Sequence, residues 1–321
     1  MGHYLIIRMV GIVPQLFLIS LLAFAIMKAA PGDPVAALVG GSAEFMSEAD
    51  HQRVAHNLGL DRSLIVQYGM WVNNVLQGDL GRSLKDGREI RSMLFEGLAA
   101  TLILVGCAWG VIALMAVSAG YWAGSRRRSW VDYIVSACAL VSFATPTFWM
   151  GLILILVFSV ELDLFPSAGQ TSLGDASFVD QLQHLVLPLL TIVLTQIGPY
   201  IRLVRGSIQD TLLSDFMRAA RARGLTKSTV VWRYLFPNAL TPCITWAGFS
   251  FPLLVGGTFI VEWVFGWPGM GRLFLQAAMG RNYPLLMAAV LITGLLVIAG
   301  NLFADLLVAW LNPKLRRGYG R

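Results

Sequence analysis

The sequence predicts an all-α polytopic membrane protein with six transmembrane helices. Hydrophobic residues make up 56% of the 321 residues and charged residues only 13%, and the mean hydropathy is +0.68. Soluble domains carry about twice that fraction of charge. A helix needs about 20 consecutive apolar residues to cross a bilayer, because its backbone polar groups must be satisfied within the segment. The stretches that meet this requirement are approximately 9–28, 98–124, 131–160, 184–205, 239–263 and 284–311.

The distribution of Lys and Arg predicts that both termini lie in the cytoplasm. With this orientation, 15 of the 24 basic residues fall in short inside segments. The other nine lie outside, several of them in one long loop that is rich in acids. An excess of Lys and Arg in short loops marks the cytoplasmic side. The net charge of +6 is therefore a topology signal, and nucleic-acid binding is not expected.

The first apolar stretch is expected to remain in the protein as a signal anchor. Ala23-Phe24-Ala25 resembles the small-residue site at which a secretory signal peptide is cleaved. However, the apolar run over residues 9–27 is longer than the usual core of about 7–15 residues. Five further spans follow it, which also favours retention.

The segment 31–97, between the first two spans, is expected to form a small helical extracytoplasmic cap. Two amphipathic helices are predicted, at 47–58 and 65–76, because apolar residues recur there at helical spacing. Ser47, with Asp50 three residues later, is placed to cap the first of them. A passive linker would not need this pattern. The predicted division of the chain is therefore 1–30, the cap at 31–97, and a five-helix core at 98–321.

Two features of the core concern how its helices pack. The second span contains Gly106-x-x-x-Gly110 and Gly120-x-x-x-Gly124, spacings that permit close contact between helices. Prolines lie inside the predicted third and fourth spans, where neighbouring groups or water can satisfy the carbonyls they free. Kinked helices suit a pore that opens and closes, although most membrane prolines are structural. These prolines are Pro146, Pro188 and Pro199.

A glycine-rich turn follows the fifth span and is a candidate outer gate. Its tryptophans fit the aromatic belt at the membrane interface. Glu262 lies near the outer end of the span, and an acid at membrane depth is a functional candidate by default. The alternative is a structural role, in which Glu262 snorkels to the interface or pairs with Arg272 or Arg281. The outer-gate candidates are Glu262, Trp267, Pro268, Gly269, Gly271 and Arg272.

The polar segment 215–238, between the fourth and fifth spans, is predicted to be a cytoplasmic docking element. It carries five basic residues and one acid. Ser214 or Asp215 is placed to cap a short helix. Alanine favours the helix, and Gly224 can end it in the left-handed conformation. Thr226 or Ser228 would start a second short helix, and Pro237 marks entry into the fifth span.

A helix with an alanine face can fit closely into a groove of another protein, while its arginines pair with acids at the rim. Two such helices, within residues 214–237, would form an elbow that transmits motion from a partner to a pore. The candidate interface comprises Asp215, Arg218, Ala219, Ala220, Arg221, Ala222, Arg223, Gly224 and Leu225.

No catalytic, metal or cofactor site is expected in the chain. It lacks a G-x-x-x-x-G-K-[ST] loop, so ATP would have to be bound by another subunit. His51 and His56 lack a third ligand nearby. The three cysteines each fall inside a predicted span without a partner at short spacing, as is typical of small buried residues: Cys107, Cys138 and Cys243.

At the docking segment the chain resembles a known family. The pattern Arg218-Ala219-Ala220-x-x-x-Gly224, followed by a hydrophobic residue and Pro237, is similar to the Glu-Ala-Ala-x-x-x-Gly coupling motif of binding-protein-dependent ABC importer permeases. Arg218 replaces the Glu, as is usual in the dipeptide/oligopeptide/nickel branch. The tail and one loop depart from the branch at Asn312 and Asn282, where Asp is common. Further similar stretches lie at 31–34, 58–61, 67–68, 78–81, 267–272 and 312–316, so the resemblance covers essentially the whole chain.

The resemblance implies an ABC type I importer permease fold in a bacterial plasma (inner) membrane. It also implies a heterodimer with a second homologous permease subunit, two cytoplasmic ATP-binding subunits that hold ATP and Mg, and an extracytoplasmic substrate-binding protein. Di- or oligopeptides are the expected substrates, with nickel complexes, glutathione and sugars as alternatives. An ABC exporter subunit would show long helices reaching into the cytoplasm. A membrane scaffold or sensor that moves no solute would explain the elbow but not the six-span array.

Overall fold

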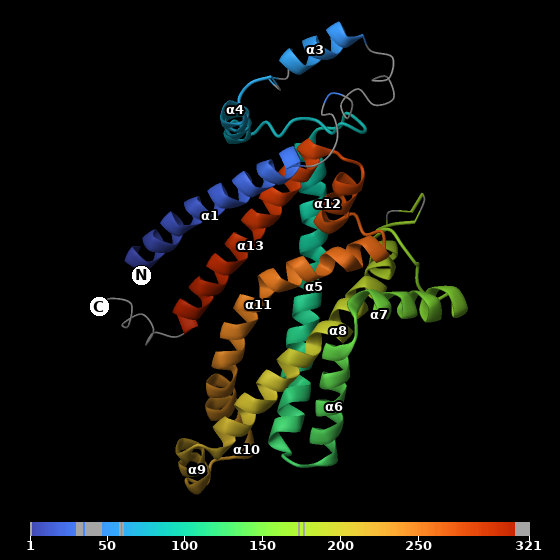
Figure 1. Cartoon of the computed structure of the whole chain (residues 1–321). Coiled ribbons are helices and arrows are strands. Elements are labelled where there is room, and N and C mark those ends of the chain that lie inside the picture. The colour runs from blue at the N-terminus through green and yellow to red at the C-terminus, as the bar shows by residue number, and fades with distance from the viewer. Residues whose placement is uncertain are drawn as a thin grey trace. The chain divides into compact units, whose positions relative to one another are not determined.

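The computed structural model describes residues 2–29, 35, 47–57, 59, 61–172, 174, 175 and 177–311 (Figure 1). Within these residues the chain is helical, apart from turns, loops and two isolated β-bridges. It divides into two compact units. The N-terminal unit comprises Gly2–Ala100 and Pro268–Leu296, and the core unit comprises Thr101–Trp267 and Val297–Arg321. The division predicted from the sequence, at residues 30 and 97, stays a prediction.

The N-terminal unit contains the predicted cap helices. Ser47 caps the first of them, because its hydroxyl oxygen accepts a hydrogen bond from the Asp50 backbone N–H at 3.2 Å and donates to the Asp50 carboxylate at 2.7 Å. The prolines and glycine at 31–34 and the tail at 312–316 lie outside the described residues. The helices of this unit are α1 (Gly2–Ala29), α3 (Glu48–Asn57), α4 (Leu64–Leu76), the first turns of α5 (Ile90–Ser125), α12 (Met270–Met279) and the first half of α13 (Tyr283–Leu311).

The beginning of α5 packs with α12 and α13 in a hydrophobic core. Asn282 fastens the preceding turn to this core, since its side-chain amide donates to the Ser83 hydroxyl at 2.8 Å and its oxygen accepts from the Leu84 N–H at 3.3 Å. Asn282, one departure from the family pattern, therefore has a structural role. The buried residues of this core are Ile90, Met93, Leu94, Met270, Ala277, Leu285, Ala288 and Ala289.

The core unit contains the remaining helices. Helix α8 is the most enclosed span, with 67% of its apolar window buried, whereas the corresponding share in α5 is 39%. The helices that follow α5 are α6 (Trp130–Ala144), α7 (Thr147–Leu154) with the π-helix η2 (Ile155–Glu161), α8 (Phe178–Leu213), α9 (Asp215–Ala222), α10 (Lys227–Thr229) with the π-helix η3 (Val230–Leu235), and α11 (Phe236–Val264).

Three helices of the described chain are long and apolar enough to cross a membrane by themselves: Ile90–Ser125, Phe178–Leu213 and Tyr283–Phe303. A bent pair, Trp130–Ala144 with Thr147–Glu161, brings the number to four if it counts as one span. Helices α5 and α8 are each 36 residues long, more than the predicted stretches and more than a bilayer requires. In α1 and α11 the described apolar parts are shorter, at Val10–Ala25 and Leu254–Val264. The multi-pass helical membrane class is established, and the count of six stays a prediction.

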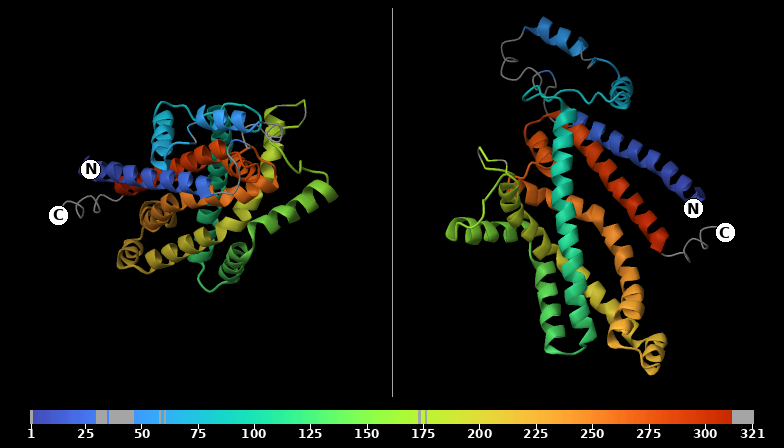
Figure 2. Two further views of the ribbon diagram at one scale, coloured as in Figure 1. Left: turned by 45° about the horizontal axis from the view of Figure 1, so that its top comes forward. Right: turned by 180° about the vertical axis from the view of Figure 1, so that it is seen from behind.

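The predicted third span, 131–160, is sharply bent at the proline that it contains. Its two halves, α6 and α7, are bent by 102° relative to each other (Figure 2). The break lies at Thr145 and Pro146. A proline has no N–H to donate, and it forces the preceding residue into an extended conformation, as seen in the ψ of 123° at Thr145. Pro188 and Pro199, by contrast, remain inside the uninterrupted α8.

Candidate functional site

The predicted docking element folds as an elbow of short helices between α8 and α11, within the core unit (Figure 1). Gly224 has a φ of +69°, the left-handed conformation expected of it. Thr226 caps α10 by accepting a hydrogen bond from the Thr229 N–H at 3.3 Å. Ser214 occupies the cap position of α9, but its hydroxyl donates to the Thr211 carbonyl at 2.5 Å and makes no capping bond. Pro237 lies in the first turn of α11, as predicted.

One face of α9 is buried in the chain's own core. Met217 is 0% exposed and Ala220 is 3% exposed. Ala220 therefore packs α9 against the helices behind it. The sequence predicts that Ala220 belongs to an alanine surface that faces a partner, and this expectation is corrected. The residues of this elbow core come from α8, α9, η3 and α11: Val204, Ile208, Met217, Val230, Leu235, Ala239 and Cys243.

The opposite face of α9 is exposed and has the composition expected of a docking surface. Phe216, Ala219 and Ala222 follow one another at three-residue spacing, so they lie on one side of the helix. All three are exposed, and Phe216 was not among the sequence candidates, although its spacing from Ala219 is a signal that could have found it. Exposed arginines flank this stripe: Arg218, Arg221 and Arg223.

The arginines of the elbow are held only weakly by the chain itself. Arg218 forms an ion pair with Asp215 at 2.7 Å, but the two side chains are 73% and 93% exposed. An ion pair so open to water contributes about 0–1 kcal/mol. Leaving that pair for an acid of another protein would cost little. The stripe Phe216, Ala219 and Ala222, with its flanking arginines, is called the elbow face below.

Behind the elbow, α5 lies very close to α8. A Cβ added at Gly120 would lie 2.7 Å from the Val204 side chain, and one added at Gly124 would lie 2.9 Å from the Arg205 carbonyl oxygen. The prediction of close contact is confirmed at this pair. Gly106 and Gly110 have the same spacing, but an added Cβ would meet nothing within 4 Å at either.

An ion pair joins α6 to α8 at the same end of the core unit. The Arg205 guanidinium holds Asp132 in a forked arrangement, with Nε donating to Oδ1 and Nη2 donating to Oδ2 at 3.0 Å. The Arg128 backbone N–H also donates to Oδ2 at 3.0 Å, which fixes the basic turn before α6. Asp132 is 3% exposed. This pair was not predicted from the sequence, although an acid and an arginine at the adjoining ends of two predicted spans were a signal for it.

Glu262 is buried within the core unit. It lies in the last turn of α11 and is 0% exposed, and the Thr101 hydroxyl of α5 donates to its Oε1 at 2.6 Å. A snorkelling carboxylate would be exposed, so burial argues against that alternative. Trp267 is only 2% exposed, which corrects its expected place in an interfacial aromatic belt. Because the remaining gate candidates belong to the N-terminal unit, pairing of Glu262 with Arg272 or Arg281 stays a prediction.

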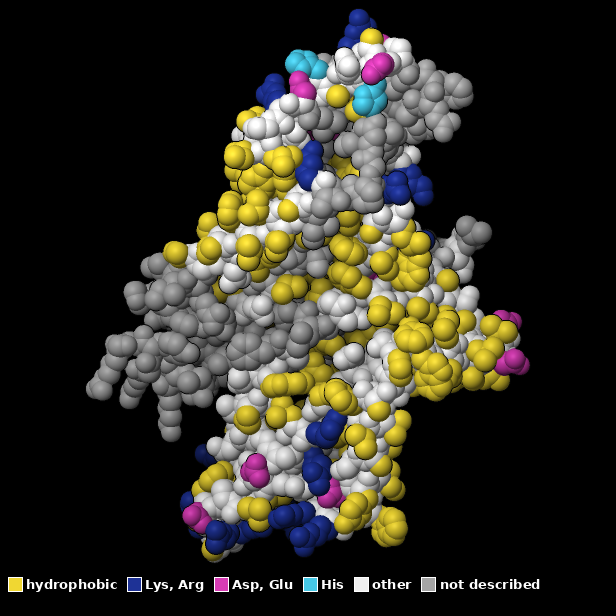
Figure 3. Space-filling view, in the orientation of Figure 1, with side chains coloured by type: hydrophobic (Ala, Val, Ile, Leu, Met, Phe, Trp, Pro, Cys, Tyr) yellow, Lys and Arg dark blue, Asp and Glu magenta, His cyan; other side chains and the backbone are white. Residues whose placement is uncertain are grey.

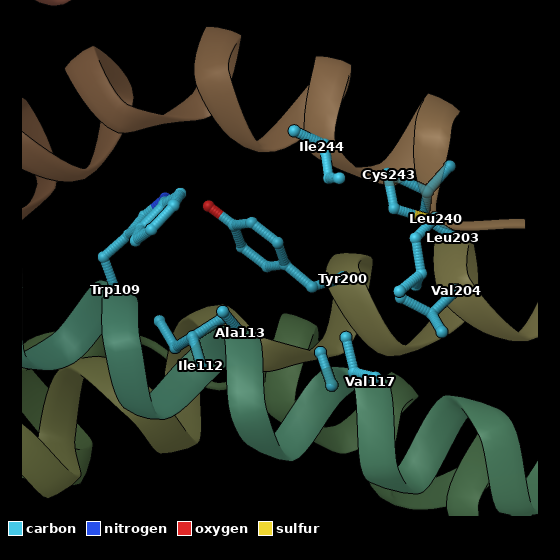
Figure 4. A pocket seen from close by; sticks show the side chains of 11 residues that line it. Trp109, Ile112, Ala113, Val117, Tyr200, Leu203, Val204, Leu240, Cys243 and Ile244 are labelled. Atoms are coloured by element: carbon cyan, nitrogen blue, oxygen red, sulfur yellow. The ribbon is translucent and has the colours of Figure 1, made fainter. Parts of the chain in front are cut away.

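An apolar cavity of about 120 Å³ lies between α5, α8 and α11 (Figure 4). Tyr200 is one of the lining residues, and its hydroxyl donates to Ser250 at 2.8 Å. No charged side chain lines the cavity, and no cluster of three metal-ligating side chains occurs in the described part of the chain. The lining residues include Trp109, Ile112, Val117, Tyr200, Val204, Leu240 and Cys243.

Apolar helices long enough to cross a membrane, with a polar, arginine-bearing elbow between two of them, define a helical membrane protein. Residues 116–317 match the family model described as the binding-protein-dependent transport system inner membrane component, and residues 1–103 match the model of the N-terminal part of such a component. The chain belongs to this family. The resemblance stated from the sequence is thereby confirmed, and the family is one of inner-membrane transport subunits.

Relatives match along the full length. The chain is 35% identical over 317 residues to the oligopeptide transport system permease protein AppB of Bacillus subtilis, covering 98% of this chain and 99% of the relative. It is 37% identical over 321 residues to the glutathione transport system permease protein GsiC of Escherichia coli, with coverage of 98% and 99%. A putative peptide permease protein of Brucella suis is 35% identical over 318 residues, with the same coverage.

Solved structures show the fold. An inward-facing MetNI methionine ABC transporter matches with a TM-score of 0.57 at 18% identity, covering 68% of this chain and 96% of that one. An amino acid ABC transporter crystallised with histidines matches with a TM-score of 0.53 at 17% identity, covering 68% and 93%. Two thirds of the chain therefore have the fold of ABC importer permeases.

Proposed function

We propose that this chain is the translocation subunit of an ATP-driven importer whose substrates are di- or oligopeptides. Peptide transport is what the relatives' names share, and glutathione is itself a short peptide. No described feature favours nickel: the chain has no cluster of metal-ligating side chains in its described part. Sugars have no support among these relatives.

The elbow face is the observation that carries the proposal. Small, exposed Ala219 and Ala222 allow close approach of a partner, Phe216 provides an apolar anchor, and the arginines can pair with acids. We infer that this face docks a cytoplasmic ATP-binding subunit. ATP and Mg would be held by two such subunits, because the sequence contains no P-loop.

The elbow core connects that face to the helices of the core unit. Met217 packs with Val204 and Ile208 of α8 and with Ala239 of α11. The Ser207 hydroxyl of α8 donates to the Ala239 carbonyl at 2.6 Å, which ties the two helices together. A displacement of α9 would therefore be passed to α8 and α11. Through Arg205 and Asp132 it would reach α6 as well.

The remaining parts of the proposed assembly follow from the family. The chain would cross the inner membrane six times with both termini in the cytoplasm, α1 and α11 supplying the spans that complete the count. It would pair with a second homologous permease, and its cap would face an extracytoplasmic substrate-binding protein. Exposed apolar side chains along α1 and α11 support both spans, among them Val13, Phe17, Leu18 and Ile260.

Reconstitution tests the function. The chain is placed in proteoliposomes with the second permease, the ATP-binding subunits and the binding protein, and ATP-dependent uptake of labelled di- and oligopeptides is measured. Uptake that disappears when the chain is omitted, and that unlabelled peptides but not sugars or nickel complexes compete away, is the expected result. Peptide-stimulated ATP hydrolysis without uptake would instead support the scaffold or sensor alternative.

A further inference from the structure

Helix α4 of the cap lies against α1. The Tyr68 hydroxyl of α4 is 2.7 Å from the Ser20 hydroxyl of α1. The Tyr68 ring also meets Phe24 and Phe17 edge to face, with ring centroids 5.5 and 6.2 Å apart. Both helices belong to the N-terminal unit, so their mutual placement is defined. The contact covers α1 from Phe17 to Phe24.

The position of this contact along α1 gives its depth. Lys28 is the first charged residue after the apolar run of α1, and Ser20 comes eight residues before it. At a rise of about 1.5 Å per residue, Ser20 is about 12 Å from the charged end. One leaflet of hydrocarbon is about 15 Å thick. With α1 crossing the membrane, as proposed above, the α4 contact would lie along a part of α1 that the hydrocarbon of one leaflet surrounds.

The composition of α4 suits such a position. None of its 13 residues is charged. Ile65, Gly69, Val72 and Leu76 share one face by their spacing, and this face borders the side that contacts α1. Ile65 is 84% exposed and Leu76 is 81% exposed. Burial of these side chains against an apolar neighbour would be favourable.

Two polar side chains of α4, Gln67 and Asn74, lie on the other side of the helix, whereas Asn73 borders the Ile65–Leu76 face. Gln67 and Asn74 are seven residues apart and share that side with Met70. The Gln67 side-chain amide donates to the Arg62 carbonyl at 2.7 Å, and the Arg62 guanidinium lies 3.6 Å from the Met70 sulfur. The charge that precedes the helix is therefore held on the side away from Ile65.

We propose that α4 is an interfacial helix that inserts into the lipid leaflet at the Ala29 end of α1. Its Ile65–Leu76 face lies against acyl chains, and its Gln67–Asn74 side faces the headgroups and water. Exposed apolar side chains also occur along α1, and apolar side chains gather over α1 and α4 in Figure 3. Amphipathic helices without a full span are held at membranes in this way. The proposal names lipid, rather than the substrate-binding protein, as the partner of α4, and it rests on α1 crossing the membrane.

Spin-label accessibility tests the proposal. The three native cysteines are replaced by alanine, and single labels are placed by Ile65→Cys, Leu76→Cys, Asn74→Cys and Leu18→Cys. These positions are all exposed, so labelling should leave the fold intact. The full chain, with its transport partners, is reconstituted in vesicles of phosphatidylcholine and phosphatidylglycerol. Collision rates with oxygen, which partitions into lipid, and with a water-soluble nickel chelate are then compared.

Labels at Ile65 and Leu76 should match the α1 reference at Leu18, with an oxygen-to-nickel ratio several-fold above that at Asn74. Equal ratios at positions 65, 76 and 74 would overturn the proposal while leaving α1 as a span. Protection of positions 65 and 76 from both reagents when the binding protein is added would also overturn it, by showing that a protein covers the face. A water-exposed label at Leu18 would refute both the α1 span and the proposal.

Discussion

Charged side chains are exposed at the elbow and buried at the Glu262 site, although both sites lie in the core unit. At the elbow, apolar Met217 and Ala220 face inward and the arginines are exposed. At the end of α11, the carboxylate of Glu262 is fully buried and bonded to Thr101. Exposed charges are solvated and lose little by changing partners, whereas a buried charge must be satisfied inside the protein. The elbow is therefore suited to recognition by another subunit, and the Glu262 site to holding helices together.

Both sites act on the same two helices. The elbow core packs on the beginning of α11 and includes partly buried Val117 and Tyr121 of α5. The Glu262 bond joins the end of α11 to Thr101 of α5. A change at either site thus alters the α5–α11 pair, and variants at the two sites can be compared by the same measurements.

Asp132→Ala is expected to destabilise the protein strongly. It leaves the Arg205 guanidinium without its forked partner and the Arg128 N–H without an acceptor. Loss of one member of a buried pair costs about 3 kcal/mol, here at the lower end because the Arg205 side chain is 30% exposed. Thermal unfolding of the detergent-solubilised complex measures the loss.

Asp215→Ala is the matched control, since it also removes the aspartate of an aspartate–arginine ion pair. Its pair is exposed, so the expected change is below about 0.5 kcal/mol. Exchange of the charges, by Asp132→Arg with Arg205→Asp, should recover part of the stability lost in Asp132→Ala. Equal losses for the two alanine variants would remove the distinction between held and available charges.

Ala222→Trp should separate docking from folding at the elbow. The added ring stands on the exposed elbow face, so the unfolding midpoint should be unchanged. Close approach of the ATP-binding subunit would be blocked at a cost of about 2 kcal/mol, or roughly 30-fold in affinity. Co-purification of that subunit and peptide uptake measure this loss. The outcome that would contradict the prediction is normal association of the ATP-binding subunit.

Met217→Ala, on the same helix, should affect folding, in contrast to Ala222→Trp. Truncation of this buried side chain should destabilise the protein by about 2–5 kcal/mol, through lost burial and the cavity it leaves. Ala220→Trp should be destabilising as well, because the residue is packed against the elbow core and overpacking strains it. If Ala220→Trp folds normally and blocks docking, the inward orientation of Ala220 is wrong.

Local chemistry was predictable from the sequence at several positions. The cap at Ser47, the left-handed turn at Gly224, the cap at Thr226 and the helix start near Pro237 depend on neighbours within a few residues. Each of these features appears as expected. The family resemblance likewise rests on short local motifs, and it extends over the whole chain.

Long-range packing was not predictable in the same way. Gly106 and Gly120 begin identical spacings on one helix, but only Gly120 meets a neighbour, Val204, which lies far away in the sequence. Ala220 faces inward and Ala219 outward because the phase of α9 is set by α8 and α11. A sequence pattern gives the spacing of such residues, whereas partner helices decide which side is covered.

Glu262→Gln is expected to have a small effect, and it tests what the buried carboxylate does. The amide keeps the shape and can still accept the Thr101 hydroxyl, so the chain should fold. The bond loses its charged acceptor, which is worth about 1 kcal/mol, or roughly fivefold in an equilibrium between closed and open states. If that bond holds α5 to α11 in the resting state, basal ATP hydrolysis by the complex should rise by up to that factor. Thr101→Val removes the donor and should act in the same direction.

A rise in basal ATP hydrolysis in Glu262→Gln alone would mean that the important partner is another group, with Arg272 and Arg281 the first to test by charge reversal. Wild-type basal hydrolysis and uptake in both variants would show that the bond only anchors the end of α11.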